Sequence, residues 1–306
     1  MVARDCSAVN EGSFVIRALL RNGGYGATTT HMKSEIVYNI LAKHLDAYRE
    51  ANIIIRSTMP HEVVKSLSPA DFERVRFIQL LSTPADASDL EAWGEGIPID
   101  IVLRDPAKEF VLLYNYTNLL DTHPVRISIP VLPGVSKATK LAVSLNFGVK
   151  LIFAQPDDFL FAELTQVLDL YLHHLEARRP VEIFHTLFLS FYEGWSTSLW
   201  EIAEEDPSQV RYISDDGKET ISSRFVGFNL RDDVEHFVEA YASELISEKR
   251  ECHECEFFNR CGGYFKWPDK SYDCVEVKKL FATLKSAADE LKQDLAGYRA
   301  MEVTQP

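Results

Sequence analysis

The sequence predicts an α/β fold: a partial (β/α) barrel of parallel strands, followed by a small C-terminal metal-binding domain. Three observations predict it. Short β-branched runs alternate with helical segments, several of these runs carry charges between apolar neighbours, and four of the five cysteines lie within residues 252–274. We therefore expect two domains, an α/β barrel over residues 1–200 and a metal-binding domain over residues 201–306.

The barrel domain is expected to begin with a strand at residues 14–20, which ends at a turn-forming Asn-Gly-Gly-Tyr-Gly segment. Helical spacing of apolar residues then predicts a helix over 32–50. Further strands are expected in the β-branched runs at 53–55, 75–81, 99–103, 125–129, 149–153 and 181–188, with helices at 87–93 and 158–178. This alternation favours parallel strands joined by crossovers, as an open sheet or as a complete or partial barrel, and we favour the partial barrel.

Charged residues recur inside these strands. A parallel sheet covered on both faces has strands that are apolar almost throughout, so charges at alternate positions indicate a face that looks into a wet interior. We expect Arg126, Lys150 and Glu182 to line that interior and to hold a small substrate there. The alternative is that each charge lies at a strand end and meets solvent.

The C-terminal part begins with a different kind of element. Residues 211–221 are expected to form a β-hairpin around Asp216-Gly217, a favoured two-residue turn. A helix over 233–248 leads into the cysteine segment, and a second helix over 275–298 follows it.

The cysteine segment has the composition of a metal site. Two residues separate Cys252 from Cys255, five more precede Cys261, and twelve more precede Cys274. The two glycines after Cys261 allow the backbone to bend closely around a bound group. Thiolates favour zinc or iron–sulfur over hard cations. Structural zinc sites commonly use two close pairs, so the single close pair and uneven spacing favour iron–sulfur, with zinc as the alternative.

The run Cys-x2-Cys-x5-Cys-Gly-Gly, preceded by an Asp-Gly hairpin and a helix and followed by a distant cysteine, resembles the SPASM or twitch region of radical-SAM enzymes that modify peptides and proteins. The resemblance covers about residues 205–275 and implies that Cys252, Cys255, Cys261 and Cys274 match the ligands of the second of two auxiliary [4Fe–4S] clusters. A first-cluster ligand of the family falls at Phe265 in this sequence, and the hairpin stretch has no cysteine. One auxiliary cluster is therefore expected.

The N-terminal part departs further from that family. Radical-SAM enzymes bind the cluster that cleaves S-adenosylmethionine (SAM) through a Cys-x3-Cys-x2-Cys loop directly after the first barrel strand. The corresponding loop in this chain, residues 21–32, has no cysteine, and no Gly-Gly-Glu-Pro-like segment is found near Ser82-Thr-Pro84. The resemblance thus implies a degenerate radical-SAM-like barrel that binds no SAM and does not cleave it.

The composition limits the partners. A net charge of −14 argues against a protein whose main work is binding nucleic acid. The sequence shows neither a secretory signal nor an apolar run long enough to span a membrane, so we expect a cytoplasmic protein without a membrane partner.

The function that these features favour is that of an iron–sulfur protein related to radical-SAM peptide maturases. It would act as the partner subunit of a radical-SAM enzyme, or as a component that binds the peptide substrate, in peptide modification or natural-product biosynthesis. Two alternatives remain: a non-radical enzyme that uses the barrel interior, and a zinc-stapled binding protein. No set of nucleophile, histidine and acid can be assigned from spacing, so the catalytic residues are unknown.

Overall fold

The computed structural model describes residues 36–81, 83, 87–174, 179–220, 222–225 and 234–303. The strand expected at residues 14–20 and the loop expected at 21–32 lie outside these ranges.

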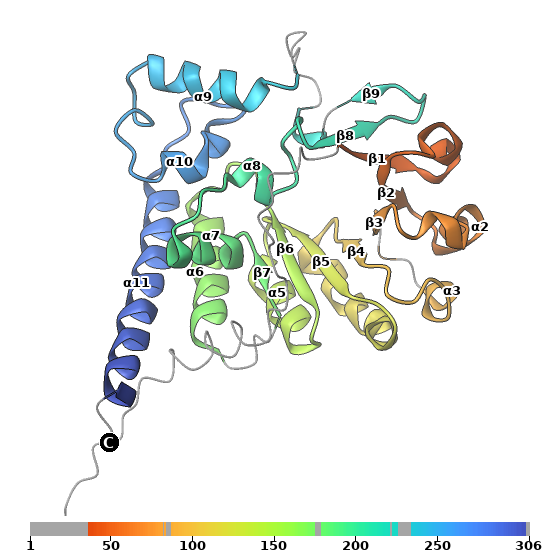
Figure 1. The fold of residues 1–306 in the computed structure, drawn as a ribbon, viewed down its shortest axis with the longest axis horizontal. Coiled ribbons are helices and arrows are strands. Elements are labelled where there is room, and N and C mark those ends of the chain that lie inside the picture. Colours follow the sequence, from red (N-terminus) through yellow and green to blue (C-terminus); the bar gives the residue numbers. More distant parts are fainter. Residues whose placement is uncertain are drawn as a thin grey trace, which may run out of the picture.

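The described chain is an α/β fold, as expected, and its strands form one nine-stranded sheet (Figure 1). The order across the sheet is β7-β6-β5-β4-β3-β2-β1-β8-β9. All neighbouring strands are parallel except the pair β8 and β9. The strands are β1 Val37–Leu41, β2 Asn52–Ser57, β3 Val75–Leu80, β4 Ile99–Val102, β5 Val125–Pro130, β6 Gly148–Ile152, β7 Val181–Glu182, β8 Val210–Ile213 and β9 Glu219–Thr220.

Because β1 to β7 follow one another in chain order, crossovers of the usual right-handed sense place their helices on one side of the sheet. Figure 1 shows α2, α3, α5 and α6 along that side, with the short α8 on the other. The α-helices are α2 Pro60–Ser66, α3 Ser88–Glu91, α4 Pro106–Glu109, α5 Val135–Ser144, α6 Asp158–His173, α7 Phe184–Glu193, α8 Leu199–Ile202, α9 Phe237–Ser247, α10 Phe258–Cys261 and α11 Val275–Val303. The 3-10 helices are η1 Ala42–Tyr48, η2 Pro69–Asp71, η3 Phe110–Asp121, η4 Ser223–Phe225 and η5 Tyr264–Lys266.

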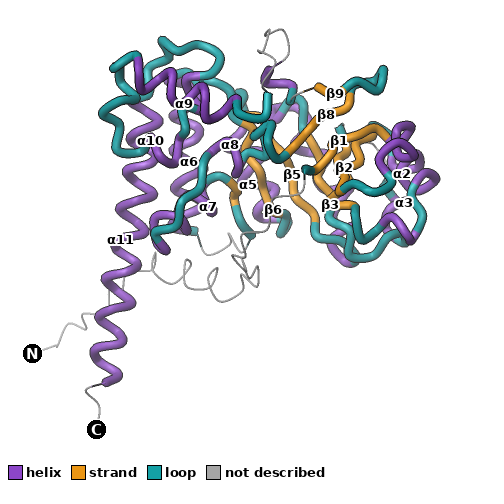
Figure 2. Tube along the Cα trace, turned by 45° about the horizontal axis from the view of Figure 1, so that its top comes forward, coloured by secondary structure: helices purple, strands orange, loops and turns teal. Residues whose placement is uncertain are grey.

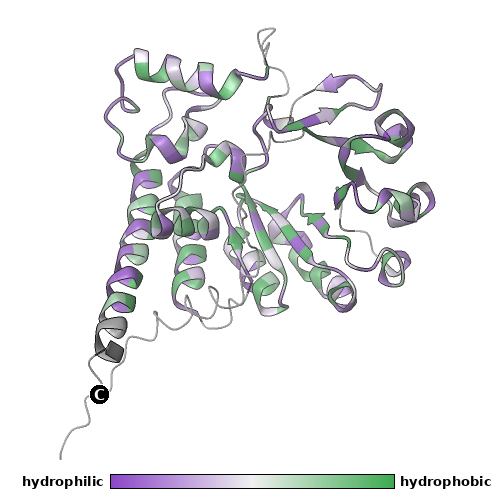
Figure 3. Cartoon of the chain, in the orientation of Figure 1, coloured by the Kyte–Doolittle hydropathy of each residue, from purple (hydrophilic) through white to green (hydrophobic). Residues whose placement is uncertain are grey.

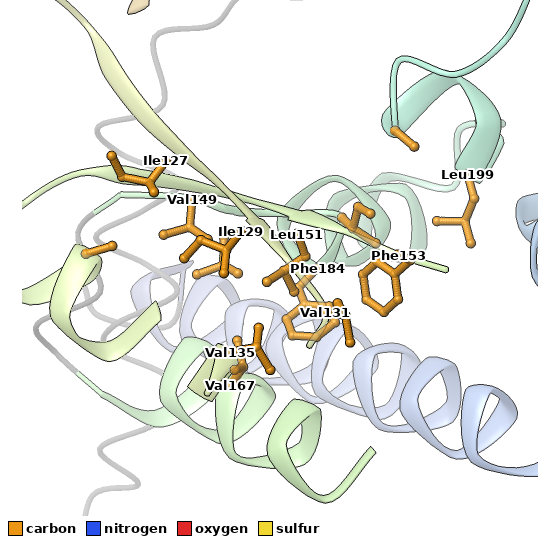
Figure 4. Close-up of a cluster of buried hydrophobic side chains, with 14 of the residues drawn as sticks. Ile127, Ile129, Val131, Val135, Val149, Leu151, Phe153, Val167, Phe184 and Leu199 are labelled. Atoms are coloured by element: carbon orange, nitrogen blue, oxygen red, sulfur yellow. The ribbon is translucent and has the colours of Figure 1, made fainter. Parts of the chain in front are cut away.

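The main core lies between the sheet and these helices. Ile127 and Ile129 of β5 and Leu151 of β6 are fully buried beside Val135 of α5 and Val167 of α6 (Figure 4). Burying each such side chain stabilises the fold by about 1.5–3 kcal/mol. Since side chains alternate along a strand, the residues between them point to the opposite side of the sheet.

Two expectations are wrong. A helix was predicted over 32–50, but the described part of this range forms the strand β1 and the 3-10 helix η1. β1, which contains the buried Ile40, pairs with β2 and β8. This strand pairing outweighs the helical spacing of its apolar residues. The strand predicted over 181–188 ends at Glu182, and α7 begins two residues later. Phe184, Leu187 and Phe188 are buried at helical spacing, so the apolar run serves a helix instead.

The C-terminal elements agree with the prediction. β8 and β9 form an antiparallel hairpin whose turn contains Gly217 at a φ of 82°. α9 precedes the cysteine segment, and α11 follows it and packs against α6 and α7 (Figure 2). None of the helices in the described ranges has both the length and the apolar composition needed to cross a bilayer.

Candidate metal centre and sheet cavity

All four cysteines of the C-terminal segment line one small cavity of about 20 Å³. Cys252 and Cys274 are buried, Cys255 and Cys261 are half-buried, and none of the four is in a disulfide. They come from different local structures: a turn holds the first pair, Cys261 ends α10, and Cys274 directly precedes α11. Folding thus brings together thiols that are spread over 23 residues of sequence.

Two glycines turn the chain back toward this cavity. Gly262 and Gly263 follow Cys261 with φ values of 57° and 76°, a left-handed conformation that residues with a Cβ rarely adopt. A Cβ on Gly263 would also overlap Cδ1 of Leu245 in α9. The segment after Cys261 therefore requires glycine both for its backbone and for its close approach to α9.

We expect Gly263→Ala to lower the free energy of unfolding by about 2–3 kcal/mol, because it combines a left-handed backbone with this overlap. Gly194→Ala is the matched control, since Gly194 has a φ of 78° and no atom within 4 Å of an added Cβ. Urea denaturation of both variants measures the difference. Equal losses would show that the approach to Leu245 contributes nothing.

Burial raises the pKa of three of these thiols, those of Cys252, Cys261 and Cys274. Burial raises the pKa of Cys261 to about 11 and that of Cys274 to about 12. The Lys266 ammonium acts in the opposite direction on the pKa of Cys274, and its Nζ donates to Glu251 Oε2 at 2.6 Å. Since metals bind cysteine as thiolate, a bound metal centre would supply the positive charge that deprotonation of these thiols requires.

A zinc ion and a [4Fe–4S] cluster differ in how far apart they hold their four cysteine sulfurs. A tetrahedral zinc ion with Zn–S bonds of ~2.3 Å holds its four sulfurs within about 4 Å of one another. In the described part of the chain, no three His, Cys, Asp or Glu side chains are gathered closely enough to hold an ion. In a [4Fe–4S] core each cysteine binds a different iron, so the sulfurs lie farther apart around a shared space. Four cysteines that line one cavity are a donor set that either kind of centre uses.

A second, larger cavity of about 360 Å³ lies on the polar side of the sheet. Strands β2, β3, β5 and β6 contribute polar side chains to its wall, and the segment after α8 and the start of η5 lie opposite. The polar residues that line it include Arg56, Gln79, Ser128, Lys150, Glu205 and Tyr264.

Strand register explains why polar residues collect there. Arg56 is opposite Gln79, Gln79 opposite Asp100, and Asp100 opposite Arg126, so one polar row crosses four neighbouring strands. Hydrophilic and hydrophobic residues alternate along these strands (Figure 3). Gln79 donates to Asp100 at 3.0 Å, which joins neighbours in the row.

Two of the predicted interior residues meet at a carboxylate that sequence reasoning missed. Both guanidinium NH groups of Arg126 donate to the oxygens of Glu204 at 2.7 Å. Lys150 Nζ donates to Glu204 Oε2 at 2.6 Å, and Arg126 also contacts Asp100 at 3.2 Å. No sequence signal marks Glu204, which is separated from its partners by 54 and 78 residues.

Glu182, the third predicted interior residue, lies opposite Lys150 in the β6–β7 register. Its carboxylate accepts a hydrogen bond from Thr186 at 2.7 Å, whereas Lys150 pairs with Glu204. Of the three predicted interior residues, Lys150 lines the sheet cavity, whereas Arg126 and Glu182 do not. The structure thus joins Arg126 and Lys150 in one network and places Glu182 beside it.

Glu204 is held in an unusual conformation. It follows α8 with a φ of 58°, a region that costs a non-glycine residue roughly 1–3 kcal/mol. Burial alone would raise its pKa, but Lys150 and Arg126 outweigh burial and lower the pKa of Glu204 to about 2. The carboxylate is therefore ionised at neutral pH and ties α8 to the strands.

This shift predicts acid sensitivity. The pKa of Glu204 lies below the glutamate value of about 4.3 in an unfolded chain, so the unfolded state binds more protons between about pH 5 and pH 2. We expect the stability that Glu204 contributes, about 1–3 kcal/mol, to be present above that window and lost as the pH falls through it. Urea denaturation from pH 7 to pH 3 measures it. If Glu204→Gln has the same pH dependence as the wild type, Glu204 is not its source.

The two cavities lie on either side of η5. Tyr264, at its start, lines the sheet cavity, and Lys266, at its end, lines the cysteine cavity. The buried Arg224 holds this turn in place by donating to the carbonyls of Tyr264 at 2.6 Å and Phe153 at 3.0 Å. The cysteine segment is thereby fixed to the sheet.

A scan against protein-family models matches no family, and searches of curated proteins and of solved structures find no significant similarity.

Proposed function

We propose that the chain binds one [4Fe–4S] cluster through Cys252, Cys255, Cys261 and Cys274. The observation that carries this proposal is that all four thiols line one cavity although they come from three local structures. The aromatic rings of Phe257, Phe258 and Phe281 line the same cavity, and such a shell keeps water from a cluster and tunes its potential.

We further propose that the chain is a degenerate relative of radical-SAM peptide maturases that does not cleave SAM. Parallel strands in chain order with a polar inner side support a partial barrel, and the cysteine segment fixed to it supports a SPASM or twitch-like region. Phe265, where the family has a first-cluster ligand, packs against Phe153 with ring centroids 5.5 Å apart. This packing supports a single cluster.

In this proposal the chain acts as the partner subunit of a radical-SAM enzyme or as the component that binds its peptide substrate. The cluster would supply one-electron transfer or hold the C-terminal region in shape. The chain's own residues hold it: the four cysteines as thiolates, Lys266 as a buried positive charge, and the backbone of Gly263 and Phe265 through hydrogen bonds to the Cys261 sulfur. The sheet cavity supplies the binding site for substrate.

Anaerobic reconstitution tests the proposal. We expect about four iron and four sulfide ions per chain, with visible absorbance that bleaches on reduction. With SAM and a reductant, the reconstituted protein is expected to form no 5′-deoxyadenosine, and a radical-SAM enzyme is expected to co-purify from the native host. One zinc ion per chain without sulfide would establish the zinc-stapled alternative. Formation of 5′-deoxyadenosine would overturn the loss of SAM cleavage.

A further inference from the structure

One cation that lines the sheet cavity, Arg56, forms no ion pair with a carboxylate of the described residues. Arg126 and Lys150 pair with Glu204, and Arg224 pairs with Glu205 at 3.5 Å. Of the residues that line the cavity, Arg56, Lys150 and Glu205 carry charges, and Lys150 is paired with Glu204. The carboxylate of Asp215, outside the lining, acts on the pKa of Arg56 without forming an ion pair with it.

Arg56 is fixed in place but retains free donors. Its NH1 group donates to the backbone oxygen of Asn39 at 2.9 Å and to its side-chain oxygen at 3.0 Å, and its NH2 group donates to the carbonyl of Ile213. A guanidinium has five N–H donors, so about two remain. Burial lowers the pKa of Arg56, although Tyr212 and Asp215 act in the opposite direction. These bonds hold the side chain without neutralising it.

A residue in the wall of this cavity has a buried hydroxyl without a partner among the described residues. Ser222 is 4% exposed and lines the cavity, and its Oγ has no hydrogen-bond partner among the described residues. Buried polar groups are nearly always hydrogen-bonded, so an unpaired one at a cavity wall indicates a missing acceptor or donor. Arg56 and Ser222 therefore both lack what a polar ligand would supply.

We propose that the sheet cavity binds the carboxylate of an amino-acid-sized monoanion, either free or at the C-terminus of a peptide. Arg56 pairs with the carboxylate, and Ser222 hydrogen-bonds a polar group of the ligand. A planar guanidinium fork matches a carboxylate, and one arginine without an ion pair among the described residues matches a monoanion better than a phosphate dianion. The volume of about 360 Å³ is near the lower end for small-molecule sites. The peptide source rests on the function proposed above.

Isothermal titration with matched pairs of probes tests this assignment. The probes are the N-acetyl derivatives of the twenty amino acids and their neutral amides, and acetylated tripeptides as acids and as amides. We expect at least one acid to bind at least about tenfold more tightly than its amide. Arg56→Gln is expected to remove this preference, whereas Arg76→Gln, which changes an exposed arginine on β3, is expected to keep it.

Ser222→Ala provides a second test, which leaves Arg56 and its hydrogen bonds unchanged. Because its hydroxyl has no partner among the described residues, its removal is expected to keep or raise the melting temperature of the free protein while weakening acid binding severalfold. Loss of both stability and affinity would indicate a structural role for Ser222 and would contradict its assignment to the ligand.

The tripeptide arm distinguishes the two sources. Tight binding of tripeptide acids indicates a peptide C-terminus, and binding of the single amino-acid derivatives alone indicates a free metabolite. The carboxylate site is refuted if no acid binds better than its amide, or if Arg56→Gln binds like the wild type. Iron and sulfide are measured on the same samples. If the cluster is missing but the acid still binds, the proposed function is contradicted and the carboxylate site is supported.

Discussion

A Cys274→Ala variant is expected to retain less than about one tenth of the iron of the wild-type protein after anaerobic reconstitution, and to lose its visible absorbance. In the proposed site Cys274 is the buried ligand that precedes α11, so it would join the cluster to the helix that packs against α6 and α7. Since metal binding contributes to folding free energy, the melting temperature of the loaded protein is also expected to fall by several degrees.

The sequence provides the control for this variant. Cys6 is the fifth cysteine and is far from the other four in sequence, so Cys6→Ala is expected to bind iron like the wild type. Iron content, sulfide content and melting temperature are measured side by side on the two variants. Retention of full iron by Cys274→Ala would remove this residue from the ligand set.

A Glu204→Gln variant is expected to lose about 2–4 kcal/mol of unfolding free energy at pH 7. Removing one partner of a buried ion pair typically costs about 3–5 kcal/mol, and the expected loss is smaller because the Glu204 side chain is 30% exposed. Arg126 and Lys150 both depend on this carboxylate. Removing its charge leaves two largely buried cations, of which Arg126 keeps its contact with Asp100 and Lys150 loses its ion pair. Urea denaturation at neutral pH measures the loss.

Two further variants isolate this effect. Glu95→Gln changes an exposed glutamate, and its effect is expected to stay within about 0.5 kcal/mol. Lys150→Met removes one of the two cations that pair with Glu204. We expect it to lower the free energy of unfolding less in the Glu204→Gln background than in the wild-type protein, and the difference between the two losses is the coupling energy. Full additivity of the two changes would contradict the network.

Most strands could be predicted from the sequence. The runs that became β2 to β6 are short and β-branched, and each has one side buried against helices, so local pattern and tertiary environment agree. The prediction was wrong at β1 and α7, where the apolar spacing fits either a strand or a helix. Strand pairing decided the first case, and burial of one helix face decided the second.

The candidate sites could be predicted to different extents. The ligands proposed for the cluster lie within 23 consecutive residues, so cysteine spacing was enough to name them, and the structure placed all four at one cavity. The sheet cavity draws on strands and loops from Arg56 to Tyr264. Of the interior residues that the sequence indicated, Arg126, Lys150 and Glu182, only Lys150 lines it. Glu204 and Arg56 carried no local signal.

The sequence by itself determined the α/β class, the alternation of polar and apolar residues along the strands, and the grouping of four thiols. These features depend on neighbouring residues and on side-chain chemistry, which a linear pattern contains. Only the tertiary structure decided that Glu204 meets Arg126 and Lys150 and that Arg56 has no carboxylate partner among the described residues. Electrostatic pairing depends on distance in space, and the crossovers of a parallel sheet bring together residues that no sequence spacing relates.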